Sequence, residues 1–160
     1  MKHTFHLIAG VLIALAGCRT AAIPEAAPPA SRGEMSQIRT PKDQQHIGVE
    51  GDPLCPDAQK PCVKVRVEIV VPNGLTPFLA VEPMLVAPKM YIQPQIHGVK
   101  SGGATSALVY LGKNDNGARQ WFKIHLFACK DPNRFREAEQ ILHFPSDCDI
   151  ADPVEVYRER

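Results

Sequence analysis

The feature that most constrains the fold is an alternation of apolar and polar residues in CVKVRVEIVV, residues 62–71. The odd-numbered residues from Val63 to Val71 are all apolar, and the even-numbered ones from Lys64 to Glu68 are all charged. A period of two residues is that of a half-buried β-strand. Asn73-Gly74 follows this segment, and this pair tolerates the positive φ that tight turns demand. We therefore predict a strand that ends in a tight turn.

Other segments rich in strand-forming residues follow at short intervals. They are residues 78–82, 84–87, 90–99, 106–112, 120–128 and 154–159. A second Asn-Gly pair, Asn116-Gly117, lies between two of them and predicts a hairpin. One stretch has helical spacing: Asp131 can cap a helix that continues to Leu142. The pattern predicts an all-β fold, an antiparallel β-sandwich of about seven strands with one short helix.

The start of the chain has a different character. Residues 7–16 carry no charge and follow a short segment that contains Lys2. A membrane-spanning helix needs about 20 apolar residues, so this run of about ten is typical of a secretion signal. Its end, Leu15-Ala16-Gly17-Cys18, resembles the lipobox of bacterial lipoproteins in composition, order and position. The resemblance covers about the first 20 residues.

This resemblance implies cleavage before Cys18 and attachment of lipid to the Cys18 thiol. Two or more acyl chains, at roughly 0.8 kcal/mol for each buried methylene, would hold the protein on a membrane permanently. Arg19 stands where lipoproteins kept in the inner membrane often have Asp, which by analogy favours the outer membrane. An ordinary signal peptide, in which Cys18 has no special role, is the alternative.

Composition divides the rest of the chain. Residues 18–45 are rich in Ala, Pro, Ser and charge, and predict an extended, lipidated tether between a signal peptide (1–17) and one folded domain (46–160). Lys2 is the one charged residue of the signal, so the mature chain has 17 basic and 17 acidic side chains. This neutral balance, without a basic cluster, gives no reason to expect a nucleic-acid partner.

Four cysteines remain beside Cys18. An even number in an exported chain predicts two disulfides, because the periplasm is oxidising. Three pairings exist, and we expect the two that are local in sequence. A zinc site is disfavoured because the spacings of 7 and 19 residues lack the close Cys pairs of such sites. The expected bridges are Cys55–Cys62 and Cys129–Cys148.

The sequence contains no motif that predicts a reaction. It has no phosphate-binding glycine loop and no nucleophile elbow. His97, His125 and His143 do not lie within ligand spacing of one another, so we expect ordinary histidines and no metal. We therefore predict a protein that is not an enzyme and needs no cofactor.

The segment EPMLVAPKMYIQPQIHGV, residues 82–99, departs from a plain strand pattern. Its prolines, Pro83, Pro88 and Pro94, each remove a backbone donor and confine it to a sheet edge or to short broken strands. Two interpretations stay open: packing in the core with prolines as guards against aggregation, or an edge that docks a partner. For the second, the candidate interface residues are Met90, Tyr91, Gln93 and Gln95.

Two function classes fit these expectations. The first is an outer-membrane lipoprotein whose periplasmic β domain binds a protein, such as an immunity or inhibitor protein that neutralises a toxin or hydrolase. The second is a structural lipoprotein that docks an envelope or secretion machine, similar in plan to the lipoprotein of the type VI secretion system. Both rest on analogy of architecture.

Overall fold

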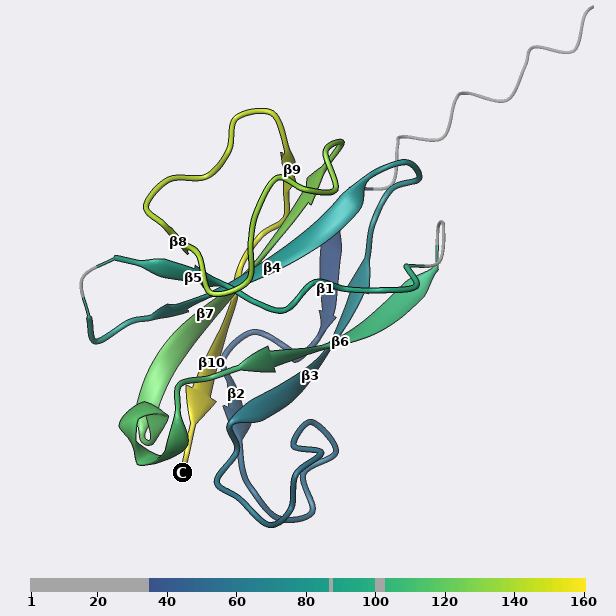
Figure 1. Ribbon diagram of the computed structural model, residues 1–160. Coiled ribbons are helices and arrows are strands. Elements are labelled where there is room, and N and C mark those ends of the chain that lie inside the picture. Colours follow the sequence, from purple (N-terminus) through teal and green to yellow (C-terminus); the bar gives the residue numbers. More distant parts are fainter. Residues whose placement is uncertain (1–34, 87, 100–102) are drawn as a thin grey trace, which may run out of the picture. The chain divides into compact units, whose positions relative to one another are not determined.

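The structure is a computed structural model that describes residues 35–86, 88–99 and 103–160. It forms two sheets that pack face to face, which confirms the β-sandwich (Figure 1). The lipobox with Cys18, and the tether up to residue 34, lie outside the described residues. The small sheet has the order β1-β3-β6, and its strands are β1 (Gln37–Thr40), β3 (Lys64–Val70) and β6 (Ala104–Tyr110).

The large sheet has seven strands in the order β2-β10-β7-β4-β5-β8, with β9 paired to the far end of β7. Within the described ranges, the parallel β2–β10 pair is the one exception to antiparallel pairing. The strands are β2 (Gln45–Ile47), β4 (Thr76–Pro83), β5 (Met90–Ile92), β7 (Gln120–Cys129), β8 (Gln140–Ile141), β9 (Asp149–Ile150) and β10 (Val154–Arg158).

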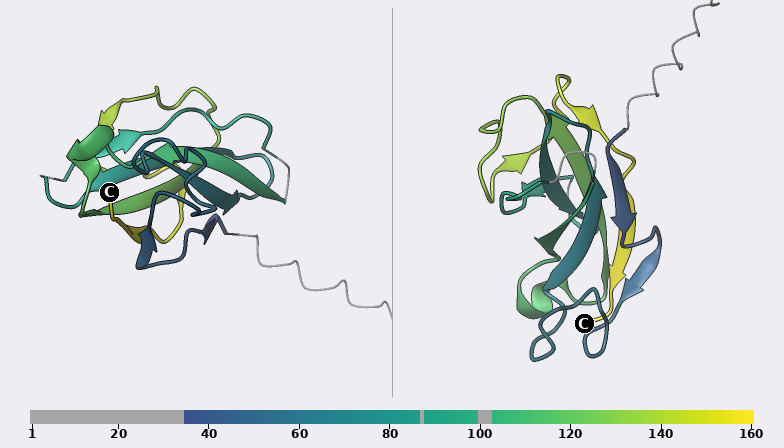
Figure 2. Two further views of the ribbon diagram at one scale, coloured as in Figure 1. Left: turned by 90° about the horizontal axis from the view of Figure 1, so that it is seen from below. Right: turned by 90° about the vertical axis from the view of Figure 1, so that its right-hand side faces the viewer.

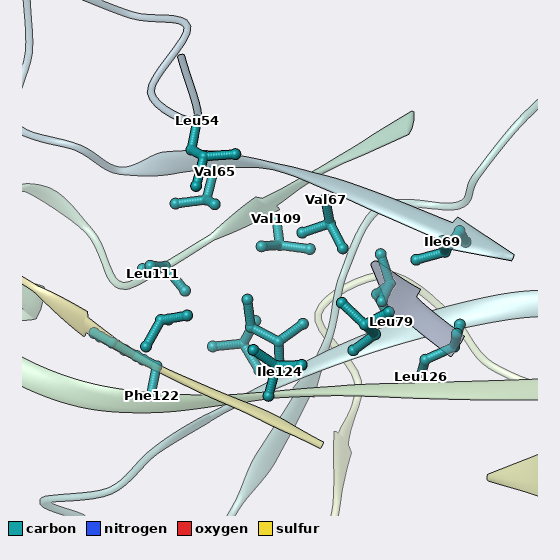
Figure 3. Close-up of a cluster of buried hydrophobic side chains, with 14 of the residues drawn as sticks. Leu54, Val65, Val67, Ile69, Leu79, Val109, Leu111, Phe122, Ile124 and Leu126 are labelled. Atoms are coloured by element: carbon teal, nitrogen blue, oxygen red, sulfur yellow. The ribbon is translucent and has the colours of Figure 1, made fainter. Parts of the chain in front are cut away.

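The main core fills the space between the sheets, as Figure 3 shows. The predicted alternation produces it: Val65, Val67 and Ile69 of β3 are fully buried. They face Leu79 and Ile124 of the large sheet in the same cluster of apolar side chains. Burying each of these side chains contributes about 1.5–3 kcal/mol.

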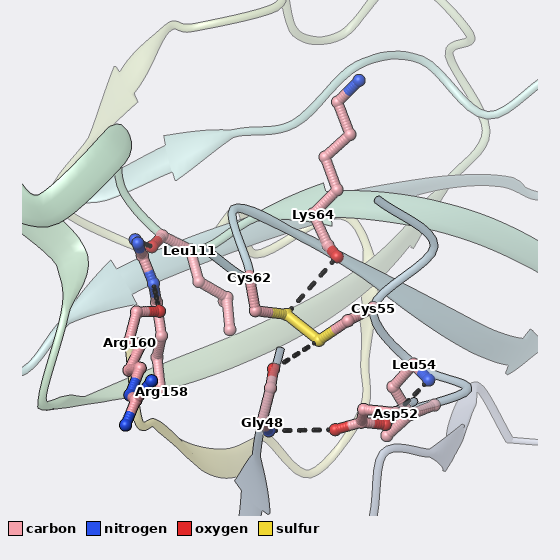
Figure 4. Close-up of a disulfide and its surroundings, with 9 residues drawn as sticks. All are labelled: Gly48, Asp52, Leu54, Cys55, Cys62, Lys64, Leu111, Arg158 and Arg160. Atoms are coloured by element: carbon pink, nitrogen blue, oxygen red, sulfur yellow. Dashed lines mark hydrogen bonds between the residues drawn. A yellow bond between two sulfur atoms is a disulfide. The ribbon is translucent and has the colours of Figure 1, made fainter. Parts of the chain in front are cut away.

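Both predicted disulfides are present and local. Cys55–Cys62 closes the loop that precedes β3, with 7 residues of separation, and Figure 4 shows its surroundings. Cys129–Cys148 joins the end of β7 to the end of a long connection, with 19 residues of separation. That connection runs from residue 130 to β9 and lies over the outer face of the large sheet (Figure 2).

The predicted helix at 131–142 is wrong. Asp131 does accept a hydrogen bond from a nearby amide, that of Asn133, but in an isolated turn. Ala138 has a φ of 63°, which a helix cannot contain, and its N–H donates to the carbonyl of Ile92 at 2.9 Å. Ile92 donates in turn to Glu139. Pairing with β5 therefore outweighs the local helical spacing.

The second Asn-Gly pair does not form a hairpin. Asn114–Gly117 is a short 3₁₀ turn, η1, between β6 of the small sheet and β7 of the large sheet. Pro72-Asn73-Gly74 likewise joins β3 to β4 across the two sheets, and Gly74 has the expected positive φ of 80°. Turn chemistry predicts the bends but not which strands they pair.

Two boundaries also differ from expectation. β1 lies inside the segment assigned to the tether, because Ile38 contributes a buried side chain to the core while β1 pairs with β3. The sequence predicts a strand at residues 84–87, but Met84–Val86 form an exposed turn after β4. Of residues 90–99 only β5 is a strand, in agreement with short strands broken by proline.

Candidate protein-binding face

The outer face of the large sheet has a covered half and an open half. The connection 130–148 covers one half, where a second apolar cluster includes Phe78 of β4 and Phe127 of β7. Phe135 packs on both rings, with centroids 5.2 and 5.9 Å away. The Cys129–Cys148 bridge ties this cover to the sheet.

An aromatic row crosses the open half. Register places Tyr157 of β10 opposite both His46 of β2 and Trp121 of β7. The ring centroids of Tyr157 lie 4.9 Å from His46 and 5.3 Å from Trp121. Directly opposed residues of neighbouring strands share one face of a sheet, so three strands contribute one ring each.

The turn that follows β4 extends this row with apolar side chains. The amide of Met84 donates to the carbonyl of Trp121 at 3.0 Å, which continues the β4–β7 register by one residue. Leu85 and Val86 follow with 77% and 60% of their surface exposed. We call His46, Tyr157, Trp121 and the turn Met84–Val86 the aromatic face.

Charged and amide groups border the aromatic face. Lys123 Nζ lies 3.2 Å from Glu155 Oε1, and Gln44 Nε2 donates to the other oxygen of Glu155 at 2.7 Å. On the other side of the row His46 Nδ1 lies 3.4 Å from Glu159 Oε1. Aromatic and Met side chains inside a polar rim are typical of protein–protein interfaces.

The four predicted interface residues do not form one exposed surface. Met90 is buried in the second apolar cluster, and Gln93 is buried between the two sheets. Gln93 Nε2 donates to Tyr91 O, and its Oε1 accepts from the Tyr110 amide at 2.7 Å. Tyr91 is half-buried and Gln95 is exposed.

Tyr91 lines a groove of about 490 Å³ at the open side of the sandwich, between the end of β6 and the large sheet. Tyr110 and Phe122 contribute two further rings to its wall, and Lys113 and Glu137 also line it. The groove is therefore largely apolar and reachable from solvent.

His125 is the one predicted histidine with a buried side chain. Its Nε2 lies 2.9 Å from Glu82 Oε2 in a recess that Phe144 and Leu142 also line. Burial lowers the pKa of His125, although the hydrogen bond to Glu82 opposes this shift. His97 and His143 are exposed, and the described residues contain no group of three metal-ligand side chains.

Sequence reasoning did not identify the aromatic face. Trp121 and Tyr157 occupy outward positions of strands that were predicted, but their neighbours depend on the pairing of β10 with β2 and β7. The one available signal is the run of four apolar residues, 84–87, placed after Pro83 where a strand should end.

No family model matches the chain, and neither a curated protein nor a solved structure shows detectable similarity to it. Among the residues that the structure describes, no helix is long and apolar enough to span a membrane.

Proposed function

We propose that this chain is a lipid-anchored protein of the outer membrane whose β domain binds a protein partner in the periplasm, without catalysing a reaction. The observation that carries the proposal is the aromatic face. Trp and Tyr are the side chains most enriched at binding hot spots, and Met adapts to irregular partner surfaces. Exposed apolar side chains at the edge of such a row favour protein contact over simple solvation.

The remaining features support the same proposal. Two disulfides suit an oxidising compartment. The lipobox supplies the anchor through Cys18, and the segment after it supplies reach from the membrane.

Within this class, we propose an immunity or inhibitor protein as the specific role. A small anchored domain that neutralises a toxin or hydrolase needs one rigid binding surface and no active site. The sandwich provides a rigid support, because the aromatic row stands on three hydrogen-bonded strands rather than on a loop.

Competition between a bacterial strain that lacks the gene for this protein and its parent strain tests the immunity role. The deletion strain should survive contact with the parent at least about tenfold less well, and wild-type protein should restore survival. Cys18→Ala and the double variant Leu85→Asp/Val86→Asp should both fail to restore it. Gln59→Asp, at an exposed position in the loop closed by Cys55–Cys62, is the matched control.

Equal survival of the deletion strain and its parent would refute the immunity role. Normal survival together with a loss of secretion or of envelope integrity would instead indicate a structural docking lipoprotein. The genes beside this one give the same distinction: a toxin gene for the first role, and a secretion or envelope operon for the second.

A further inference from the structure

The free edge of β6 differs from the other sheet edges. In the described part of the chain, the strands at the other edges have two to four residues: β1 has 4, β2 has 3 and β8 has 2. β6 has 7 residues, and residues 103–112, GATSALVYLG, contain neither a charge nor a proline. Proteins normally protect long edge strands with such residues, because an unpaired edge templates another strand.

Two hydrogen bonds show which backbone groups of β6 face away from the small sheet. Leu111 donates to Val63 of the neighbouring chain segment, so odd-numbered residues of β6 bond to β3. Antiparallel pairs alternate, so the even-numbered residues Ser106, Leu108 and Tyr110 direct their backbone groups to the other side. The amide of Tyr110 confirms this direction, because it donates to Gln93 Oε1.

Gln93 shows that the free edge of β6 binds a hydrogen-bond acceptor. Its side-chain oxygen takes the place of the strand carbonyl that would bond to Tyr110, at 2.7 Å. The segment Gln93–Val99 follows β5 and runs along the side of β6 that faces away from β3 (Figure 1). Among the described residues, no backbone hydrogen bond joins this segment to Ser106 or Leu108. Leu108 and Tyr110 are 42% and 40% exposed.

The aromatic groove adjoins the same edge at Tyr110. A strand added to β6 would direct alternate side chains toward the core side, where Tyr91 and Phe122 line the groove. A volume of about 490 Å³ suits a large apolar side chain. A second copy of β6, paired antiparallel about Ala107, would bring Ala104 and Thr105 to this point, and both are too small to fill it.

We propose that β6 is a strand-addition site for an extended, uncharged segment of a protein partner, with a large apolar side chain that enters the groove. The backbone of this segment pairs with Ser106 and Leu108, and one of its carbonyl oxygens replaces Gln93 Oε1 as the acceptor of the Tyr110 amide. The site lies on the small sheet, apart from the aromatic face on the large sheet, so it does not depend on the proposed function.

Binding of the peptide Thr-Val-Thr-Phe-Thr-Val-Thr to the full lipidated chain in detergent tests the proposal, with fluorescence polarisation of a labelled peptide as the readout. Leu108→Pro removes an outward donor that the ladder to β3 does not use, so the fold should tolerate it. It should weaken binding by about tenfold or more. Leu108→Thr keeps the donor, and should change binding by no more than about twofold.

The same peptide with every amide N-methylated keeps its side chains but cannot pair as a strand. It should not bind, and this control decides the question even where Leu108→Pro fails to fold. Equal binding of the methylated peptide, unchanged binding to Leu108→Pro, or no binding of the parent peptide at millimolar concentration would overturn the proposal. So would a dimer of the wild-type chain that Leu108→Pro dissociates, because a second copy would then occupy the edge.

Discussion

Arg158 is a fully buried charge at the point where the two sheets meet. Its Nη1 donates to the carbonyl of Leu111 at 2.6 Å, as Figure 4 shows. Gly117 of η1 lies against the same pair: a Cβ there would overlap both Arg158 Nη1 and Leu111 O. The absence of a side chain at residue 117 therefore allows the 3₁₀ turn to close over the guanidinium.

Gly117→Ala should destabilise the domain by about 1–3 kcal/mol, because the added methyl must displace either the guanidinium or the backbone. Gly48→Ala is the matched control, since its added Cβ would meet nothing nearer than Glu159 Oε2 at 3.7 Å. The control should stay within about 0.5 kcal/mol of wild type. Urea unfolding measures both, and equal losses in the two variants would count against this packing.

His125 should make stability depend on pH. Burial lowers its folded-state pKa below the ordinary 6.5, so the unfolded chain takes up the proton first as the pH falls. The contribution of neutral, buried His125 to the free energy of unfolding is fully present above pH 6.5 and is lost as the pH falls toward the folded-state pKa. Wild type should therefore lose more stability between pH 7.5 and 5.5 than His125→Gln, which keeps a donor for Glu82. Identical pH profiles in urea unfolding would rule out this role for His125.

At the scale of elements, the Cys129–Cys148 bridge holds the cover of the large sheet in place. Cys129→Ser/Cys148→Ser should cost about 3 kcal/mol, because the reduced denatured chain gains the entropy of a loop of about 20 residues. Hydrogen exchange should then rise first in the amides of Ile92 and Ala138, which pair the cover with β5. A loss confined to other regions would show that the cover does not depend on the bridge.

Local signals predicted some elements well. In β3 the alternation predicts burial correctly from residue 64 to residue 69: the odd-numbered apolar residues are buried and the even-numbered charged residues are not. The segment 131–142 has helical spacing as well, yet it bonds to Ile92, which is about 45 residues away in the chain. The spacing of apolar residues within a segment thus predicts its secondary structure only where no strand that is distant in the chain forms backbone hydrogen bonds with that segment.

The topology of the whole molecule determines the candidate sites, and for this reason the sequence predicted them only in part. The local disulfides needed no topology, and Tyr91 was selected for its neighbours in sequence. The aromatic row unites residues 46, 121 and 157, which the parallel β2–β10 pair and the antiparallel β10–β7 pair bring together. Likewise, the free edge of β6 follows from the strand order rather than from any motif.

Site-specific photocrosslinking in living cells tests most directly whether the aromatic face binds a protein. A photoreactive residue at Leu85 of the full-length protein lies at the exposed border of this face, and the same residue at Gln59 is the control. We predict one discrete protein adduct from position 85 and none from position 59. The adduct should disappear when Trp121→Ala or Tyr157→Ala is combined with the photoreactive residue at position 85, in a double variant that still folds. No protein adduct from position 85, or the same adducts from both positions, would show that the aromatic face does not bind a protein.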